Sequence, residues 1–287
     1  MKTMLFTIFS LIAFAGNSVL CRLALAENEI DAGSFTVIRL ISGTVMLCLC
    51  IVLANRSAGL RQIPTQGSWT GSALLFVYAL SFSYAYITLD TGTGALILFG
   101  AVQIFMVLFH TVTGHRILRL ELLGMVCAMS GFVYLMLPDA SSPSLNGFLL
   151  MLISGLAWAG YTLKGRNSSE PLQDTAGNFF RTIPFVLLLL MFSMEYAEFT
   201  IKGVVLAVLS GALASGLGYA VWYRALEHLG VLQAAVLQLL VPVIAAIGGV
   251  LFADEAITLR LTYASVLVLG GIVLVIVARK VDGLVKK

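Results

Sequence analysis

Ten separate apolar segments, each about twenty residues long, limit what this chain can fold into. A helix needs about 20 mostly apolar residues to cross the hydrocarbon core of a bilayer. Strands of a transmembrane barrel instead alternate apolar and polar residues over about ten positions, and these segments are continuously apolar. The sequence therefore predicts an all-α membrane protein with ten transmembrane helices. The predicted spans are residues 4–23, 34–54, 69–88, 91–112, 121–138, 146–163, 176–194, 200–223, 232–253 and 259–279.

The composition agrees with a membrane protein. Of the 287 residues, 60% are hydrophobic and only 11% are charged, which leaves too few polar side chains to cover a soluble surface of this size. The first apolar segment follows Lys2, so a cleaved secretory signal is an alternative interpretation of it. Removing that segment would leave nine spans and would break the internal repeat described below, and we therefore interpret it as a transmembrane helix.

Lysine and arginine are distributed unevenly between alternate loops. If the N-terminus is inside, the inner segments hold twelve of these residues, and the outer segments hold only Arg22, Lys202 and Arg260. Short cytoplasmic loops are enriched in Lys and Arg, so both termini are predicted to be cytoplasmic. This asymmetry accounts for the formal net charge of +3, and no nucleic-acid partner is expected.

Charged residues recur at matching places in the two halves of the chain. Arg22 ends the first span and Arg39 lies five residues into the second. Lys164 and Arg181 occupy the same places in the sixth and seventh spans. Both pairs are 17 residues apart, and the second pair follows the first at an offset of 142. The pattern predicts an internal repeat.

Each predicted repeat contains an odd number of spans: residues 1–140 hold spans one to five, and residues 141–287 hold spans six to ten. The second half must then insert upside down relative to the first. Inverted repeats of this kind can present one central site to either side of a membrane. We predict two inverted five-helix repeats. The alternative is a duplication that persists in a protein that merely packs helices.

The most specific stretch is ALEHLGVLQAAVLQLLVPVIAAIGGVLFADEAITLRLTYASVLVLGGIVLV, at residues 225–275. It contains Pro242, then Glu255, then a pair of glycines at 270 and 271. Together with the ten-span layout, this stretch resembles the EamA family of the drug/metabolite transporter (DMT) superfamily. The resemblance implies a carrier of the cytoplasmic (inner) membrane with a central cavity between its two halves. Many members of that family export amino acids or related metabolites.

Polar side chains inside the spans identify the helices that face a cavity. Such side chains are costly in lipid and normally face protein or water, and those three or four residues apart share one helix face. Spans one, three, four, six, eight and nine carry such faces, whereas spans five and ten are expected to be structural. For each aromatic residue, a place at the membrane interface is the alternative. The candidate substrate-binding residues are Asn17, Tyr78, Tyr84, Gln103, Trp158, Tyr161, Tyr219, Trp222 and Gln238.

Two arginines near span ends are candidates for gates. Arg39 is predicted to lie near the outer mouth and to pair with Asp90, and Arg181 near the inner mouth to pair with Glu227. The alternative is that both arginines extend to lipid headgroups. Pro242 should kink span nine, because proline removes a backbone hydrogen bond, and a kinked helix could serve in gating or be purely structural.

The chemistry that is missing from the sequence also limits the mechanism. All fourteen acidic residues lie in loops or at span ends, which disfavours coupling through a carboxylate buried at mid-membrane. His110 is the only intramembrane group that titrates near neutral pH, and its role stays open. No nucleotide-binding loop, metal-ligand box or catalytic triad is present, so neither an enzyme nor a cofactor is expected.

The sequence thus predicts a secondary transporter that exports small metabolites by alternating access, with amino acids or related compounds as substrates. The alternatives are a channel-like facilitator and a transporter of another metabolite or drug class. An intramembrane enzyme or assembly factor is disfavoured, because no pair of buried catalytic groups is present. The expected partners are a small-molecule substrate and the lipid bilayer, and the expected state is a monomer or homodimer.

Overall fold

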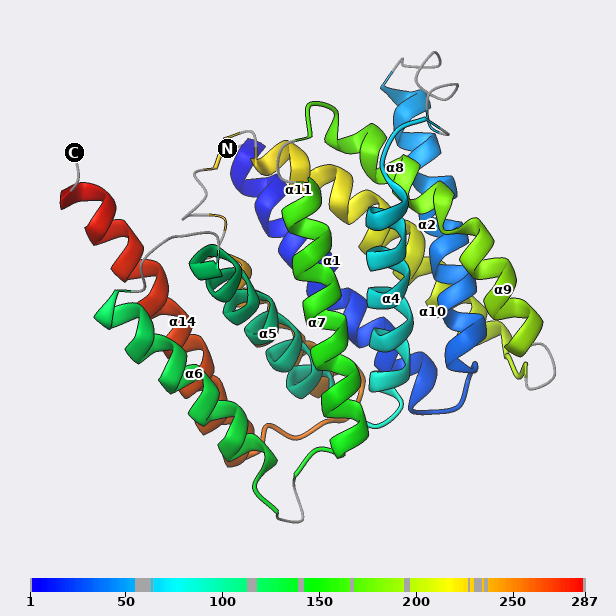
Figure 1. The fold of residues 1–287 in the computed structure, drawn as a ribbon. Coiled ribbons are helices and arrows are strands. Elements are labelled where there is room, and N and C mark those ends of the chain that lie inside the picture. The colour runs from blue at the N-terminus through cyan, green and yellow to red at the C-terminus, as the bar shows by residue number, and fades with distance from the viewer. Residues whose placement is uncertain are drawn as a thin grey trace.

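A computed structural model of the protein describes residues 2–54, 63, 65–112, 118–138, 142–165, 168–193, 197–226, 228–229, 234 and 237–285. In these ranges every regular element is helical, apart from an isolated antiparallel bridge between Ile30 and Phe199. The prediction of an all-α protein is confirmed for this part of the chain (Figure 1). The side chain of His110 lies outside the described part.

The helices follow the ten predicted spans. Eight helical segments of the described chain are long and apolar enough to cross a bilayer, and the other two predicted spans coincide with α4 and α13. Span seven consists of α8 and α9, and span eight of α10, the π-helix η2 and α11. The elements are α1 (Lys2–Leu25), α2 (Ala32–Leu53), α4 (Trp69–Tyr86), α5 (Thr91–Val112), α6 (Arg119–Met136), α7 (Leu145–Gly165), α8 (Pro171–Arg181), α9 (Ile183–Ser193), α10 (Ile201–Leu209), η2 (Ser210–Leu217), α11 (Gly218–Leu226), α13 (Leu240–Phe252) and α14 (Leu259–Val285).

Side-chain oxygens fix the starts of several helices. The first backbone N–H groups of a helix lack partners within it, and Ser, Thr or Asp just before the helix can accept from them. Asp31 caps α2 by accepting from Ser34 N at 2.8 Å. Thr200 caps α10 in the same way, by accepting from Gly203 N at 3.0 Å. These caps explain why both helices begin so soon after their turns.

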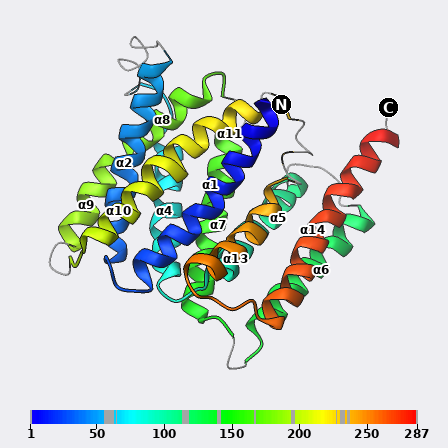
Figure 2. The same ribbon diagram turned by 180° about the vertical axis from the view of Figure 1, so that it is seen from behind.

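Helices from the two halves of the chain are interleaved. α4 packs against α7, α2 against η2, and α1 against both α11 and α13. α6 and α14 form a separate pair along one edge of the molecule, as both views show (Figures 1 and 2). These two helices correspond to spans five and ten, and their peripheral place agrees with the structural role expected for them. The inverted relation of the halves stays a prediction.

Glycines let α6 and α14 approach closely. A methyl group added at Gly124 would overlap the backbone carbonyl oxygen of Gly271, and one added at Gly271 would overlap that of Gly124. Small residues that allow such backbone contact are typical of helix packing in membranes. The absence of side chains at these two glycines therefore explains why the backbones of α6 and α14 can touch.

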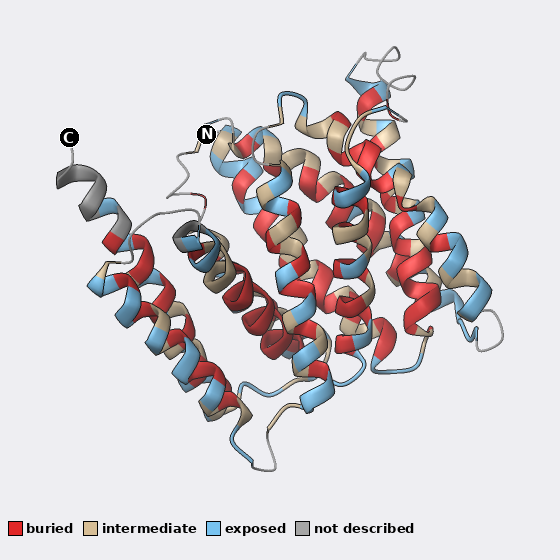
Figure 3. Cartoon of the chain, viewed as in Figure 1, coloured by how far each residue is buried: buried red, intermediate tan, exposed pale blue. Residues whose placement is uncertain are grey.

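Burial divides each helix into an inner and an outer face. Buried residues gather between the helices, whereas exposed residues follow the outer faces of α6 and other peripheral helices (Figure 3). On α6 the exposed side chains include Leu122, Leu123 and Val126, which are 53%, 52% and 57% exposed. Apolar side chains exposed over whole helices are expected where lipid is the solvent. The protein is therefore a multi-pass membrane protein.

The first and last helices define the two ends of the molecule. α1 begins and α14 ends at the same end (Figure 1), which we call the proximal end. The opposite end, where α1 ends at Leu25 and α14 begins at Leu259, is the distal end. An even number of crossings produces this arrangement. Which end faces the cytoplasm stays a prediction from the loop charges.

Candidate functional site

A small cavity lies where helices of both halves meet, and we call it the central chamber. Its volume is about 20 Å³, which is room for about one water molecule. Five of the candidate substrate-binding residues lie together in its wall, which shows that polar spacing along the helices identified the inward faces. The lining residues are Phe14, Asn17, Ser18, Tyr78, Phe82, Leu98, Phe99, Trp158, Ala214, Tyr219 and Gln238.

Aromatic rings form most of the chamber wall. The ring centroid of Trp158 lies 4.8 Å from that of Tyr78 and 5.1 Å from that of Tyr219. Trp158 also stacks on Tyr161 at 5.5 Å, and Trp222 packs edge-on against Phe14 at 5.8 Å. Tyr161 and Trp222 therefore belong to the same cluster, one layer behind the wall. Offset and edge-to-face contacts of this kind stabilise a rigid apolar surface.

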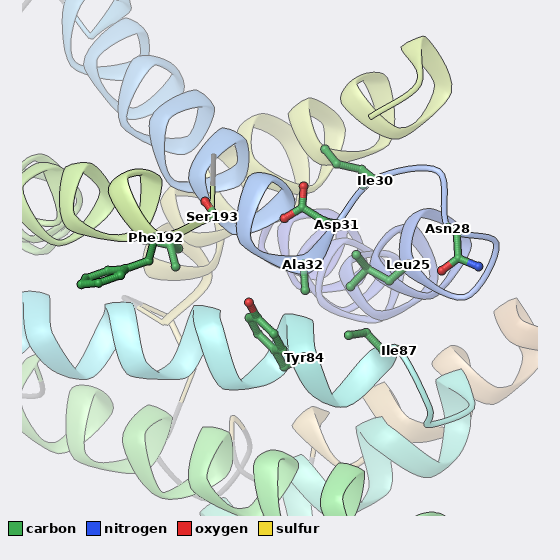
Figure 4. A pocket seen from close by; sticks show the side chains of 10 residues that line it. Leu25, Asn28, Ile30, Asp31, Ala32, Tyr84, Ile87, Phe192 and Ser193 are labelled. Carbon is green, nitrogen blue, oxygen red and sulfur yellow. The ribbon is translucent and has the colours of Figure 1, made fainter. Parts of the chain in front are cut away.

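Two candidate residues lie elsewhere. Gln103 lines a different cavity of about 10 Å³, with residues of α6 and α14 around it, because α5 runs from the chamber toward that helix pair. Tyr84 is 41% exposed and faces a pocket of about 340 Å³ at the distal end (Figure 4). It is six residues beyond Tyr78, which is about one and two-thirds helical turns, so the two tyrosines point in different directions.

Arg39 lies behind the chamber wall, fully inside the protein. Its side chain is 1% exposed, its Nη2 donates to Tyr78 Oη at 2.9 Å, and its Nε donates to Ser215 Oγ at 3.3 Å. The guanidinium carbon is 5.1 Å from the ring centroid of Tyr78 and 4.9 Å from that of Phe82, within the range of cation–π attraction. The predicted pair with Asp90 is not formed, because this face of α2 points into the core.

The π-helix η2 connects the chamber to α2. Ser210 Oγ donates to Asn17 Oδ1 at 2.6 Å, Ala214 lines the chamber, and Ser215 accepts from Arg39. Gly211 lies so close to α2 that an added methyl group would overlap the carbonyl oxygen of Arg39. Short π-helical segments occur frequently at functional sites.

Arg22 joins three segments at the distal end, in a cluster that we call the distal lock: Arg22, Asp90, Thr91 and Glu255. Arg22 Nη2 is 3.2 Å from Asp90 Oδ1, and its Nε is 3.2 Å from Glu255 Oε1. Glu255 also accepts from Thr91 N at 2.9 Å and from Thr91 Oγ1 at 3.0 Å. Arg22 lies in the last turn of α1, Thr91 begins α5, and Glu255 follows α13. The lock therefore connects the first half of the chain to the second.

Burial distinguishes the members of the distal lock. The side chains of Arg22 and Glu255 are 19% and 10% exposed, whereas that of Asp90 is 57% exposed. Burial raises the pKa of the Glu255 carboxyl above its usual value, although hydrogen bonds from Thr91 act in the opposite direction. Sequence reasoning predicted an arginine partner for Asp90 but chose the wrong one. In the sequence Arg22 stands out as a loop charge and as part of the internal repeat, and Glu255 only within the family resemblance.

A second distal contact is exposed. Lys202 Nζ lies 2.5 Å from Glu27 Oε2 and 3.1 Å from Glu29 Oε1. Beside it, Thr200 N donates to Glu29 O at 2.7 Å, and Ile30 bridges Phe199. These contacts tie the turn between α1 and α2 to the segment that precedes α10.

The predicted inner gate is only partly described. Arg181 lies at the end of α8 with its guanidinium carbon 5.9 Å from the ring centroid of Trp69, and Glu227 lies outside the described residues. Pro242 is the third residue of α13, in the first turn, where a missing N–H costs no hydrogen bond within the helix. The predicted kink of span nine at Pro242 stays a prediction, because the part of the span that precedes α13 is only partly described.

Comparisons with known proteins identify the family. The model of the EamA-like transporter family matches residues 145–277. The uncharacterized protein PA1977 of Pseudomonas aeruginosa is 50% identical over 97% of this chain and 96% of its own length. The uncharacterized transporter YoaV of Bacillus subtilis is 21% identical over 85% of this chain and 87% of its own. An uncharacterized transporter of Archaeoglobus fulgidus is 26% identical over 86% and 87% of the two chains.

The fold also has a counterpart among solved structures. A protein of known crystal structure superposes with a TM-score of 0.63, covering 95% of this chain and 98% of that one, at 18% sequence identity. Its likeness concerns the fold alone. Taken together with the family match and the relatives, these findings confirm the resemblance noted in the sequence. The chain belongs to the EamA-like transporter family of the DMT superfamily and is a membrane transporter of that type.

Proposed function

We propose that this protein exports small metabolites across the inner membrane by alternating access, with amino acids or related compounds as its substrates. Both termini would be cytoplasmic, so the proximal end would face the cytoplasm and the distal end the outside. The observation that carries the proposal is the central chamber, which is small, aromatic and built from both halves of the sequence.

The state of the chamber supports alternating access. A volume of about 20 Å³ is too small for a metabolite, since typical ligand sites have about 300 Å³ or more. A substrate could therefore enter only after helices of one half move relative to those of the other. A channel-like facilitator would instead require a path that is open at both ends at once.

The distal lock is a suitable outer gate. Arg22, Asp90 and Thr91 belong to the first half, and Glu255 belongs to the second. Opening the distal end would separate these groups, so their interactions oppose opening until substrate binding offsets the loss. In an inverted pair of repeats, residues 1–140 and 141–287, a different set of contacts would close the proximal end.

The lining of the chamber favours transport along the substrate's own gradient. No acidic side chain is among the described residues that line it. Carriers that couple to protons or sodium usually place a carboxylate in the pathway. Facilitated export or exchange is therefore the simplest mechanism consistent with this lining.

Counterflow in proteoliposomes tests this function. Liposomes that contain the purified protein and a high internal concentration of an unlabelled amino acid are diluted into a trace of the same labelled compound. We expect the label to accumulate transiently above its equilibrium level, because a carrier exchanges one bound solute for another. Protein-free liposomes are the control. Simple equilibration without an overshoot would favour the channel-like alternative, and no uptake of any amino acid or related metabolite would contradict the proposal.

Two glutamines within the spans allow a test of which cavity binds the substrate. Gln238 lines the central chamber and Gln103 lines the separate cavity beside α6 and α14. We expect Gln238→Leu to slow counterflow about fivefold, because one hydrogen bond to the solute is worth about 1 kcal/mol. Gln103→Leu should leave the rate within about twofold of wild type, at equal amounts of reconstituted protein. Equal losses in the two variants would mean that the chamber is wrongly assigned.

A further inference from the structure

The core contains a positive charge that no described acidic side chain balances. Arg39 is 1% exposed and is absent from the salt bridges of the described residues. Its Nη1 is buried and has no hydrogen-bond partner. Burying a charge without a counter-charge is strongly unfavourable, and buried charges are normally paired. An anion that binds beside Arg39 would supply the missing negative charge.

The guanidinium is separated from the central chamber only by two side chains that line it. Tyr78 accepts a hydrogen bond from Arg39 and its ring faces the guanidinium carbon, and Phe82 covers the same group. Both belong to the chamber wall. The Tyr78 hydroxyl therefore accepts from Nη2 of Arg39, while the buried Nη1 donates to no described group. A substrate oxygen could replace the hydroxyl once Tyr78 turns aside.

The geometry of arginine points to the chemical class of the substrate. The planar guanidinium presents parallel N–H donors that match the two oxygens of a carboxylate. The described lining contains no acidic side chain that could pair with an ammonium group. A solute with one carboxylate and no amino group would neutralise Arg39, whereas a zwitterion would bring an unpaired positive charge into the chamber.

We infer that Arg39 binds the carboxylate of the substrate and that the chamber prefers small monocarboxylate anions with an apolar body, such as 2-oxo acids, over zwitterionic amino acids. This inference rests on the proposed transport function and narrows its substrate class. The aromatic walls around Trp158 would receive the apolar body.

Matched competitors in the counterflow assay test the preference. The compounds share one branched apolar chain: 4-methyl-2-oxopentanoate, leucine, and 3-methylbutylamine, which lacks the carboxylate. We expect the oxo acid to compete at a concentration about tenfold lower than leucine, since one unpaired charge is worth 1 kcal/mol or more. The amine should not compete. Competition by the amine at or below the concentration of the oxo acid would overturn the inference.

Substitutions at Arg39 test the residue itself. Arg39→Gln removes the charge but keeps a donor for Tyr78, and we expect it to weaken competition by the oxo acid about 30-fold or more. Arg39→Lys keeps the charge but loses the planar pair of N–H donors, so it should recover part of this loss. The control is Arg119→Gln, which removes a positive charge from an exposed position at the start of α6 and should behave as wild type.

Thermal melting separates a binding role from a structural one. If Arg39 is reserved for a ligand, then Arg39→Gln should melt no lower than wild type without substrate, because a buried and unbalanced charge has been removed. It should also lose the rise in melting temperature that the oxo acid produces in wild type. A fall of several degrees with an unchanged order of competitors would overturn the inference while the transport function stands. If wild type transported none of these compounds, both the proposed transport function and the inference about Arg39 would be wrong.

Discussion

Replacing Gly211 with alanine is expected to abolish transport and to lower the free energy of unfolding by about 1–3 kcal/mol. An added methyl group would overlap both the carbonyl oxygen of Arg39 and the hydroxyl of Ser42. The first of these is a backbone atom, which cannot rotate away, so η2 and α2 must move apart. That movement would separate Arg39 from Ser215, whose atoms now lie 3.3 Å apart, and would displace Ala214 from the chamber wall.

A second glycine provides the matched control for this prediction. A methyl group added at Gly270, on α14, would meet no atom within 4 Å, so Gly270→Ala should keep both its stability and its transport. Melting curves in detergent and counterflow rates, measured for both variants, check the prediction. If Gly211→Ala melted and transported like Gly270→Ala, then the close contact between α2 and η2 would not be required for either property.

Substitutions in the distal lock should lower the free energy of unfolding, and the effects of substituting Arg22 and Glu255 should not be additive. Arg22→Ala leaves Glu255 without its arginine, and Glu255→Ala leaves Asp90 as the one carboxylate partner of Arg22 among the described residues. Each single change should cost about 2 kcal/mol of unfolding free energy, because hydrogen bonds to charged groups are worth about 1.5–3 kcal/mol. The double variant should lose clearly less than the sum, since both changes remove the same interaction. Counterflow should slow in all three variants, because the distal end would close less often.

The exposed ion pair at the same end provides the comparison. The side chains of Lys202 and Glu27 are 53% and 51% exposed, and surface pairs of this kind contribute little. The effects of Lys202→Ala and Glu27→Ala should therefore be additive. Each variant should keep nearly the melting temperature and the counterflow rate of wild type. Additive losses for Arg22 and Glu255 as well would mean that the distal lock is a surface contact rather than a gate.

The sequence was sufficient to predict the helices but not which helices pack against one another. Apolar runs of about twenty residues define spans directly, because the thickness of the bilayer fixes their length. Spacing along each helix then found the inward faces, so Asn17, Tyr78 and Trp158 meet in one chamber as expected. Gln103 and Tyr84 line other cavities instead. The spacing of polar residues identifies a face of a helix but not which neighbour covers it.

The assignment of charges failed for a related reason. Arg22 and Arg39 both lie toward the distal ends of consecutive helices, so sequence position alone does not decide which of them pairs with Asp90. The choice depends on how each helix is rotated about its axis, and the rotation is set by packing against the other half of the chain. The π-helical segment SGALASGL at Ser210–Leu217 could not be predicted either. Its small residues are equally suited to an α-helix in close contact.

The shared location of the start of α1 and the end of α14 has a consequence for engineering. A fluorescent or enzymatic reporter would sample the same compartment from either terminus, so a pair of such fusions measures membrane sidedness with an internal check. For the same reason, two copies can be joined into a single polypeptide by a flexible linker that never crosses the bilayer. Such a tandem could carry a substitution in one copy only.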